Sequence, residues 1–252
     1  MFAEEIRERE TPVFIPRTVY LQVPPEEDVW DSRPGFSCPP RECGNTFFLL
    51  FSRIRKKAFI FPRGIFPIMK ILGIATSPRK GANSQSLVEH ILAGAKKAGA
   101  KTELVRLCDM DISPCTGCNS CKSSGECIIE DDMEELWEKM AKADAIVLGS
   151  PVYWGRLNAQ AYPFIDRFYA HLKPDFTTDF PNGKKIVLAL TFGGMPPEAL
   201  VPLNAYVKAT FGYLGFTDAG FIWQNQCMGP RDLAKFPETI KKAEELGKTL
   251  AK

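Results

Sequence analysis

Four cysteines are the residues of this sequence whose types and spacing point most clearly to chemistry. Cys115, Cys118, Cys121 and Cys127 are separated by two, two and five residues. Iron–sulfur clusters take four Cys thiolates, and tight C-x2-C-x2-C spacing is one of their ligand patterns. Structural zinc sites usually pair two knuckles that are about a dozen or more residues apart, which fits less well. The spacing favours an iron–sulfur cluster, while cysteines without a cluster, zinc and a disulfide stay open.

A polar loop at residues 76–86 has the composition of a phosphate site. Ser and Asn side chains and backbone N–H groups at a helix N-terminus donate hydrogen bonds to phosphate, and Arg79 adds positive charge. The loop matches neither G-x-G-x-x-G nor the triphosphate loop G-x-x-x-x-G-K-[ST]. It predicts phosphate binding. The alternative is a polar turn in which Ser84 simply caps the helix.

Two further loops suit a flat ring. Residues 150–155 carry the adjacent aromatics Tyr153 and Trp154 before Gly155, and residues 191–194 end in Gly193 and Gly194, where backbone can approach a planar ligand closely. The alternatives are surface packing of the aromatics and a tight turn. Phosphate, ring and close backbone approach together favour a mononucleotide with a large planar group, and FMN fits.

The elements that position these loops alternate between strand and helix from Met69 onward. Because such alternation implies a parallel sheet covered on both faces, all three loops are expected at its carboxyl edge. Asp132-Met133-Glu134-Glu135 has the form of a capping box that opens the following helix. The expected strands are 70–75, 102–107, 145–149, 185–192 and 216–223, and the expected helices are 84–98, 132–140, 160–171, 200–214 and 237–251.

Residues 1–68 differ from the rest of the chain. They hold 9 of the 20 prolines but only 3 of the 19 glycines, and they show no export signal, so we expect a poorly ordered or dispensable extension on a cytoplasmic protein. The apolar stretch 47–51 is too short for a membrane span. The formal net charge of +2 gives no reason to expect nucleic acid.

Residues 69–252 resemble the flavodoxin-like NAD(P)H-dependent FMN reductase superfamily. The resemblance is carried by Ser77-Pro78-Arg79 with Asn83-Ser84, by the loop 150–155 and by Phe164-Ile165-Asp166-Arg167. It implies an α/β fold with a doubly wound five-stranded parallel sheet of order 2-1-3-4-5 and a Cys-rich loop insertion. The FMN-binding residues that it implies are Ser77, Arg79, Asn83, Ser84, Ser86, Pro151, Val152, Tyr153, Trp154, Gly155, Thr191, Gly193 and Gly194.

The cysteine spacing and the residues 128–133 that follow are similar to those of the iron–sulfur flavoproteins, a group within this superfamily. That likeness implies a [4Fe-4S] cluster on Cys115, Cys118, Cys121 and Cys127, beside FMN, in a homodimer or homotetramer. The expected activity is electron transfer between a ferredoxin-like or NAD(P)H donor and a small-molecule acceptor. The alternatives are a cluster-free NAD(P)H-dependent FMN or quinone reductase and a non-catalytic electron carrier.

Overall fold

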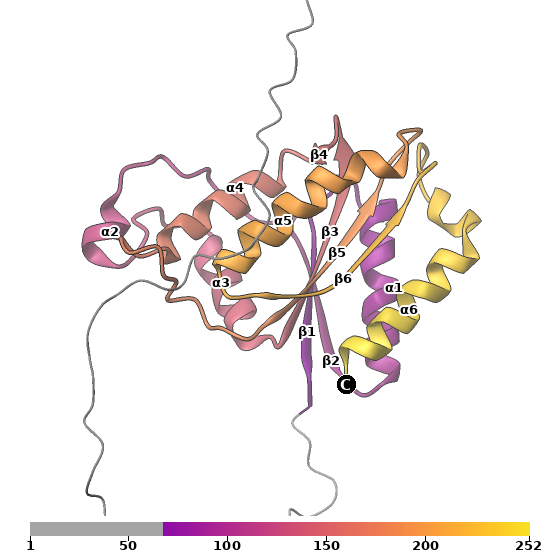
Figure 1. Ribbon diagram of the computed structural model, residues 1–252, viewed down its shortest axis with the longest axis horizontal. Helices are drawn as coiled ribbons and strands as arrows, with labels where there is room; N and C mark the ends of the chain where they lie inside the picture. The colour runs from indigo at the N-terminus through magenta and orange to yellow at the C-terminus, as the bar shows by residue number, and fades with distance from the viewer. Residues whose placement is uncertain (1–67) are drawn as a thin grey trace, which may run out of the picture. The chain divides into compact units, whose positions relative to one another are not determined.

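Residues 68–252 are the part of the chain that the computed structural model describes, so the expectations for the extension lie almost wholly outside it. Five parallel strands form a sheet in the order β2-β1-β3-β5-β6, which confirms the predicted topology (Figure 1). A two-residue strand, β4, pairs antiparallel with the end of β3 and was not predicted. The strands are β1 (Lys70–Ala75), β2 (Lys101–Arg106), β3 (Ala145–Tyr153), β4 (Arg156–Leu157), β5 (Lys185–Thr191) and β6 (Thr217–Gln224).

Helices cover the sheet on both faces. On one side lie α1 (Asn83–Lys97) and α6 (Pro237–Leu250), and on the other lie α3 (Met133–Lys142), α4 (Ala161–Asp166) and α5 (Val201–Tyr213), as Figure 1 shows. The central strands β1, β3 and β5 read as mostly apolar runs because alternate residues enter different cores. Ile71 packs in the core beneath α1 and α6, whereas its neighbour Leu72 packs in the core beneath α3, α4 and α5.

Helices α1 and α6 pack with their backbones in close approach. A Cβ built on Gly247 of α6 would lie 1.9 Å from the carbonyl oxygen of Ile91, and one built on Gly94 of α1 would lie 2.0 Å from that of Glu244. Any side chain at either position would push the helices apart. The helix that begins after the polar loop is therefore seated directly on the last helix of the described chain.

Three local expectations need correction. The helix expected at 160–171 is α4 followed by a 3-10 segment (Arg167–His171), and a short helix, α2 (Ser120–Ser124), lies unpredicted among the cysteines. The capping box is wrong, because Asp132 makes no side-chain cap to α3. Its carboxylate accepts from the Asp111 amide at 2.7 Å, while Asp131 accepts from the Met133 amide at 3.0 Å.

Within residues 68–252, no helix is both long enough and apolar enough to cross a membrane.

Candidate functional site

A cavity of about 300 Å³ lies at the carboxyl ends of β1, β3 and β5, where the sequence predicted it. We call it the carboxyl-edge cavity. The three loops that follow those strands meet around it, joined by a fourth segment after β6. Its lining residues are Ser77, Arg79, Ala82, Asn83, Ser84, Pro151, Val152, Tyr153, Thr191, Phe192, Gly193, Cys227 and Met228.

Ser84 supplies the observation that best fits a bound anion. It is 0% exposed, lies in the first turn of α1, and its hydroxyl has no hydrogen-bond partner among the described residues. The helix begins at Asn83 with Ala82 as its N-cap, so the alternative in which Ser84 merely caps the helix is wrong. A buried hydroxyl without a partner is costly, and an anion at a helix N-terminus would satisfy it.

Asn83 lines the cavity, but its side-chain amide is hydrogen-bonded to the segment after β6. Its Nδ2 donates to the Gly229 carbonyl at 2.8 Å, and its Oδ1 accepts from the Leu233 amide at 3.0 Å. The side chain thus ties the start of α1 to the segment after β6, which leaves its backbone N–H for a ligand. Ser86 is half-buried and does not line the cavity.

The last residues of β3 face the cavity, whereas the turn from β3 to β4 does not. Pro151, Val152 and Tyr153 line the cavity. Trp154 is 96% exposed with a φ of 54°, and Gly155 follows with a φ of 73°, as the tight turn to β4 requires. Trp154, Gly155 and the exposed Gly194 do not line the cavity.

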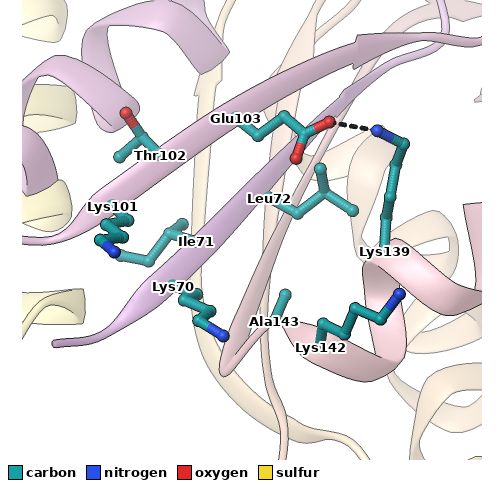
Figure 2. Close-up of a pocket in the computed structure, with 9 residues that line it drawn as sticks. All are labelled: Lys70, Ile71, Leu72, Lys101, Thr102, Glu103, Lys139, Lys142 and Ala143. Carbon is teal, nitrogen blue, oxygen red and sulfur yellow. Dashed lines mark hydrogen bonds and ion pairs between the residues drawn. The ribbon is translucent and has the colours of Figure 1, made fainter. Parts of the chain in front are cut away.

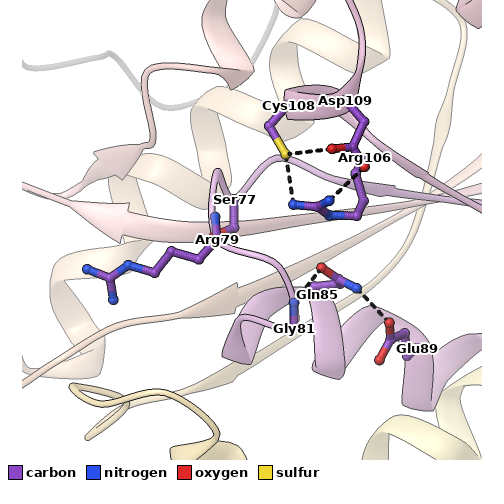
Figure 3. A network of polar contacts seen from close by, with 8 residues as sticks. All are labelled: Ser77, Arg79, Gly81, Gln85, Glu89, Arg106, Cys108 and Asp109. Atoms are coloured by element: carbon purple, nitrogen blue, oxygen red, sulfur yellow. Dashed lines mark hydrogen bonds and ion pairs between the residues drawn. The ribbon is translucent and has the colours of Figure 1, made fainter.

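Side chains of α1 hold the polar loop through hydrogen bonds (Figure 3). The Gly81 amide donates to Oε1 of Gln85 at 3.0 Å, and Nε2 of Gln85 donates to Glu89 at 2.8 Å. The Arg79 guanidinium points away from this chain of contacts, so its charge stays available at the cavity. At the end of β2, Arg106 donates to Asp109 at 2.6 Å and to the Cys108 sulfur at 2.9 Å.

The segment after β6 closes the cavity and was not included in the predicted site. The Gln226 amide donates to the Gly193 carbonyl at 3.0 Å, and the Cys227 amide donates to the Phe192 carbonyl at 2.9 Å. Burial, with the Asp232 charge nearby, raises the pKa of the Cys227 thiol to about 11. The position of Cys227 just after the last predicted strand does indicate the carboxyl edge, but the two bonds to a loop 33 and 35 residues earlier form only in the assembled sheet.

The four predicted cysteine ligands line one small cavity of about 20 Å³ between the cysteine loop, residues 110–132, and residues 167–170. Hydrogen bonds from Ser120 and Thr116 lower the pKa of the Cys118 thiol, which favours the thiolate that binds metals. The donor set thus fits an iron–sulfur cluster in kind and number. No group of three or more His, Cys, Asp or Glu side chains among residues 68–252 is close enough to hold one metal ion.

A buried ion pair anchors the cysteine loop at its base. Arg167 is 1% exposed, donates to Asp131 at 2.6 Å and to the Ser113 carbonyl at 3.0 Å, and also donates to the Ile129 carbonyl at 3.1 Å. Burial would raise the pKa of Asp131, but hydrogen bonds from Arg167 and from the Ser113 amide outweigh it and lower that pKa. The pair joins the residues just before Cys115 to those just after Cys127.

Lys122 anchors the same loop at its far end. Its ammonium donates to the carbonyls of Tyr169 and Leu172 and lies 3.8 Å from the centroid of the Tyr169 ring. Helix α2 is thereby held on the 3-10 segment that follows α4. The cysteine loop therefore packs on residues 167–172, which follow α4.

A further cavity, of about 250 Å³, lies at the other end of the strands, where β1 and β2 begin (Figure 2). It is bounded by the first residues of β1 and β2 and by the end of α3, and none of the predicted site residues lines it. Lys139 crosses it to pair with Glu103 at 2.5 Å. Of these three cavities, only the carboxyl-edge cavity and the cavity beside the cysteine loop are lined by predicted site residues.

Comparison with known proteins identifies the family. The sequence profile described as NADPH-dependent FMN reductase matches residues 69–220. The chain belongs to the NADPH-dependent FMN reductase family. Its match begins at Met69, the residue at which the composition changes.

Relatives of this FMN reductase-family chain include iron–sulfur flavoproteins. It is 46% identical over 99 residues to one from Methanocaldococcus jannaschii, covering 39% of this chain and 51% of the relative. It is 34% identical over 185 residues to one from Archaeoglobus fulgidus, covering 73% and 79%. The chain thus spans about half of the first relative and more than two thirds of the second.

Solved structures support the fold of this FMN reductase-family chain. An FMN-dependent NADH-azoreductase from Bacillus anthracis, in complex with FMN, superposes with a TM-score of 0.57 at 16% identity. The match covers 73% of this chain and 100% of the azoreductase. At this identity the likeness shows a shared fold alone.

Proposed function

We propose that this chain is an FMN- and [4Fe-4S]-dependent oxidoreductase that passes electrons from a ferredoxin-like or NAD(P)H donor to a small-molecule acceptor, such as a quinone, oxygen or peroxide. FMN accepts two electrons and releases them singly, whereas a cluster passes one at a time. Such a protein converts between two-electron and one-electron partners. The observation that carries the proposal is the presence, in one chain of this family, of a carboxyl-edge cavity and a separate cavity lined by four thiols.

The residues of the carboxyl-edge cavity divide the work of holding FMN. The Ser84 hydroxyl, the backbone amides at the start of α1 and the Arg79 charge would bind the phosphate. The apolar stretch Pro151–Tyr153 and the backbone at Gly193 would flank the ring. Both parts face one cavity, so one mononucleotide can use them together.

Anaerobic purification of the full chain tests the proposal. We expect FMN together with iron and acid-labile sulfide near four per chain. Cys118→Ser should lose iron and keep FMN, while the matched control Cys108→Ser, outside the cysteine loop, should keep both. A Cys118→Ser protein that keeps iron but loses FMN would contradict the assignment of the two sites.

A second candidate function is a cluster-free NAD(P)H-dependent FMN or quinone reductase. It is favoured by the absence, within residues 68–252, of three donor side chains close enough to hold one ion. FMN without iron in the anaerobic protein, with rapid bleaching of the flavin by NADPH, would establish it. Bound flavin without turnover for any donor would instead leave an electron carrier.

We also propose that residues 69–252 form the functional unit, in the cytoplasm, as a homodimer or homotetramer. The family match from residue 69 supports this boundary. Deletion of residues 1–68 should leave FMN binding unchanged, and loss of FMN from the truncated chain would refute the boundary. Light scattering of the purified protein measures the oligomeric state.

A further inference from the structure

The two loops that would share one FMN are joined by a single buried side chain outside the cavity. Asn158 lies just after β4, is 1% exposed and does not line the carboxyl-edge cavity. It contacts Thr76, the first residue of the polar loop, and Ser150, which immediately precedes Pro151. Thr76 and Ser150 are themselves fully buried.

Every polar atom of the Asn158 side chain is used in these contacts. Its Oδ1 accepts from the Thr76 hydroxyl and lies 2.8 Å from the Ser150 hydroxyl, which shares its one proton between this oxygen and the Pro151 carbonyl at 2.8 Å. Its Nδ2 donates to the Thr76 carbonyl at 2.7 Å and to Oε1 of Gln160 at 2.7 Å. An amide has two donor and two acceptor positions, so this side chain is saturated and held in a single orientation.

The position of the network gives it more than a packing role. The sheet already pairs the two strands at this point, because the Thr76 amide donates to the Gly149 carbonyl at 2.9 Å. Beyond that bond β1 has ended and the chain continues toward Ser77, whereas β3 continues through Pro151, paired with β5. The Asn158 amide therefore bonds to both segments at the point where β1 and β3 stop pairing with each other, just before the residues that line the cavity.

We infer that Asn158 is a positioning residue that couples the phosphate-binding loop to the ring-binding loop, an inference that rests on the proposed binding of FMN in the carboxyl-edge cavity. FMN spans both loops, so its affinity depends on their being held at the correct separation. Binding through two linked contacts is tighter than through either alone, and the gain disappears when the geometry of the link is lost. Riboflavin, which lacks the phosphate, gains nothing from the coupling.

Titration of flavins onto the full chain freed of FMN tests the inference. Asn158→Ala leaves the Thr76 and Ser150 groups without their partner, and we expect it to raise the FMN Kd about 10-fold or more. The riboflavin Kd should change much less, so the preference for FMN over riboflavin should fall. Thr76→Val, which removes one hydroxyl of the network, should change the same ratio in the same direction by a smaller factor.

Met140→Ala is the control for loss of stability alone. Met140 is fully buried in the second half of α3 and does not line the carboxyl-edge cavity, so the void left by its truncation should lower the Tm without altering the ratio of the two Kd values. An unchanged ratio in Asn158→Ala, or an equal loss of FMN and riboflavin, would overturn the inference. Failure of the wild-type chain to bind FMN would instead refute the proposed function on which it rests.

Discussion

The carboxyl-edge cavity and the cysteine loop differ in what holds their backbone. The loops of the cavity each follow a paired strand, and β3 and β5 stay in register as far as Pro151 and Thr191. The cysteine loop, in contrast, belongs to no strand and is fixed by the side chains of Arg167, Asp131 and Lys122. The sheet positions the carboxyl-edge cavity, whereas charged side chains position the cysteine loop. A substitution should therefore be able to disturb one of them and leave the other unchanged.

Breaking the Arg167–Asp131 pair should have the largest effect. Arg167→Met leaves the Asp131 carboxylate buried without its partner, and we expect the free energy of unfolding to fall by about 3–5 kcal/mol in urea denaturation. The FMN Kd should change by less than about threefold, because the sheet holds the cavity independently.

The matched control is the double variant Arg167→Met/Asp131→Leu. It removes the uncompensated charge and should recover part of the lost stability. A single variant as stable as the wild type, or one that loses FMN as readily as iron, would remove the distinction between the two sites.

The thiols of the two regions should differ next most strongly, in their rates of alkylation. The Cys227 pKa of about 11 is two units above the ordinary value of 9.0, so its thiolate fraction at pH 8 is about 100-fold lower. The pKa of Cys118 lies below that ordinary value. In iron-free protein, mass spectrometry should show iodoacetamide modification at Cys118 long before Cys227. Equal rates would contradict the environments described for both thiols.

Ser84→Ala tests the carboxyl-edge cavity by itself. Loss of a hydrogen bond to a charged phosphate, worth about 1.5–3 kcal/mol, should raise the FMN Kd by about tenfold or more. The flavin-free protein should lose no stability, because the hydroxyl has no partner there. Ser86→Ala is the comparison, and we expect no change in Kd since Ser86 lies outside the cavity lining. Equal losses in both variants would show that Ser84 has no special role.

The smallest expected effect is that of acid on the stabilising contribution of the Arg167–Asp131 pair. The folded-state pKa of Asp131 is lowered, so its contribution to stability is present above the unfolded pKa of about 3.9 and is lost as the pH falls through the folded value. The difference in free energy of unfolding between the wild type and Asp131→Asn should therefore shrink from about pH 5 toward about pH 2. A difference that stays constant with pH would argue against an ionised Asp131.

Strand–helix alternation was enough to predict the parallel sheet and its carboxyl-edge cavity, because each buried strand is a continuous apolar run such as Ile71–Ala75. Short-range polar contacts were less predictable. Asp132 has the sequence form of a cap, yet its carboxylate binds the Asp111 amide instead. The competing partner lies 21 residues away, so no local pattern contains it.

The candidate site was predictable in the same uneven way. The loops that form the cavity were predicted, but the expected roles of individual side chains within them were not all supported. Asn83 bonds with residues about 150 positions later, and the Asn158 network joins segments 82 residues apart. Such contacts exist only after the sheet has assembled, so a sequence read locally assigns Asn83 a free amide and passes over Asn158.

The close approach of α1 and α6 bears on how the protein is made. The start of α1 is held by Gly229 and Leu233 through Asn83, and the helix itself is seated on Gly247. During synthesis the polar loop leaves the ribosome long before these supports do. The end of the carboxyl-edge cavity formed by the start of α1 is therefore completed only after residues 229–247 have left the ribosome.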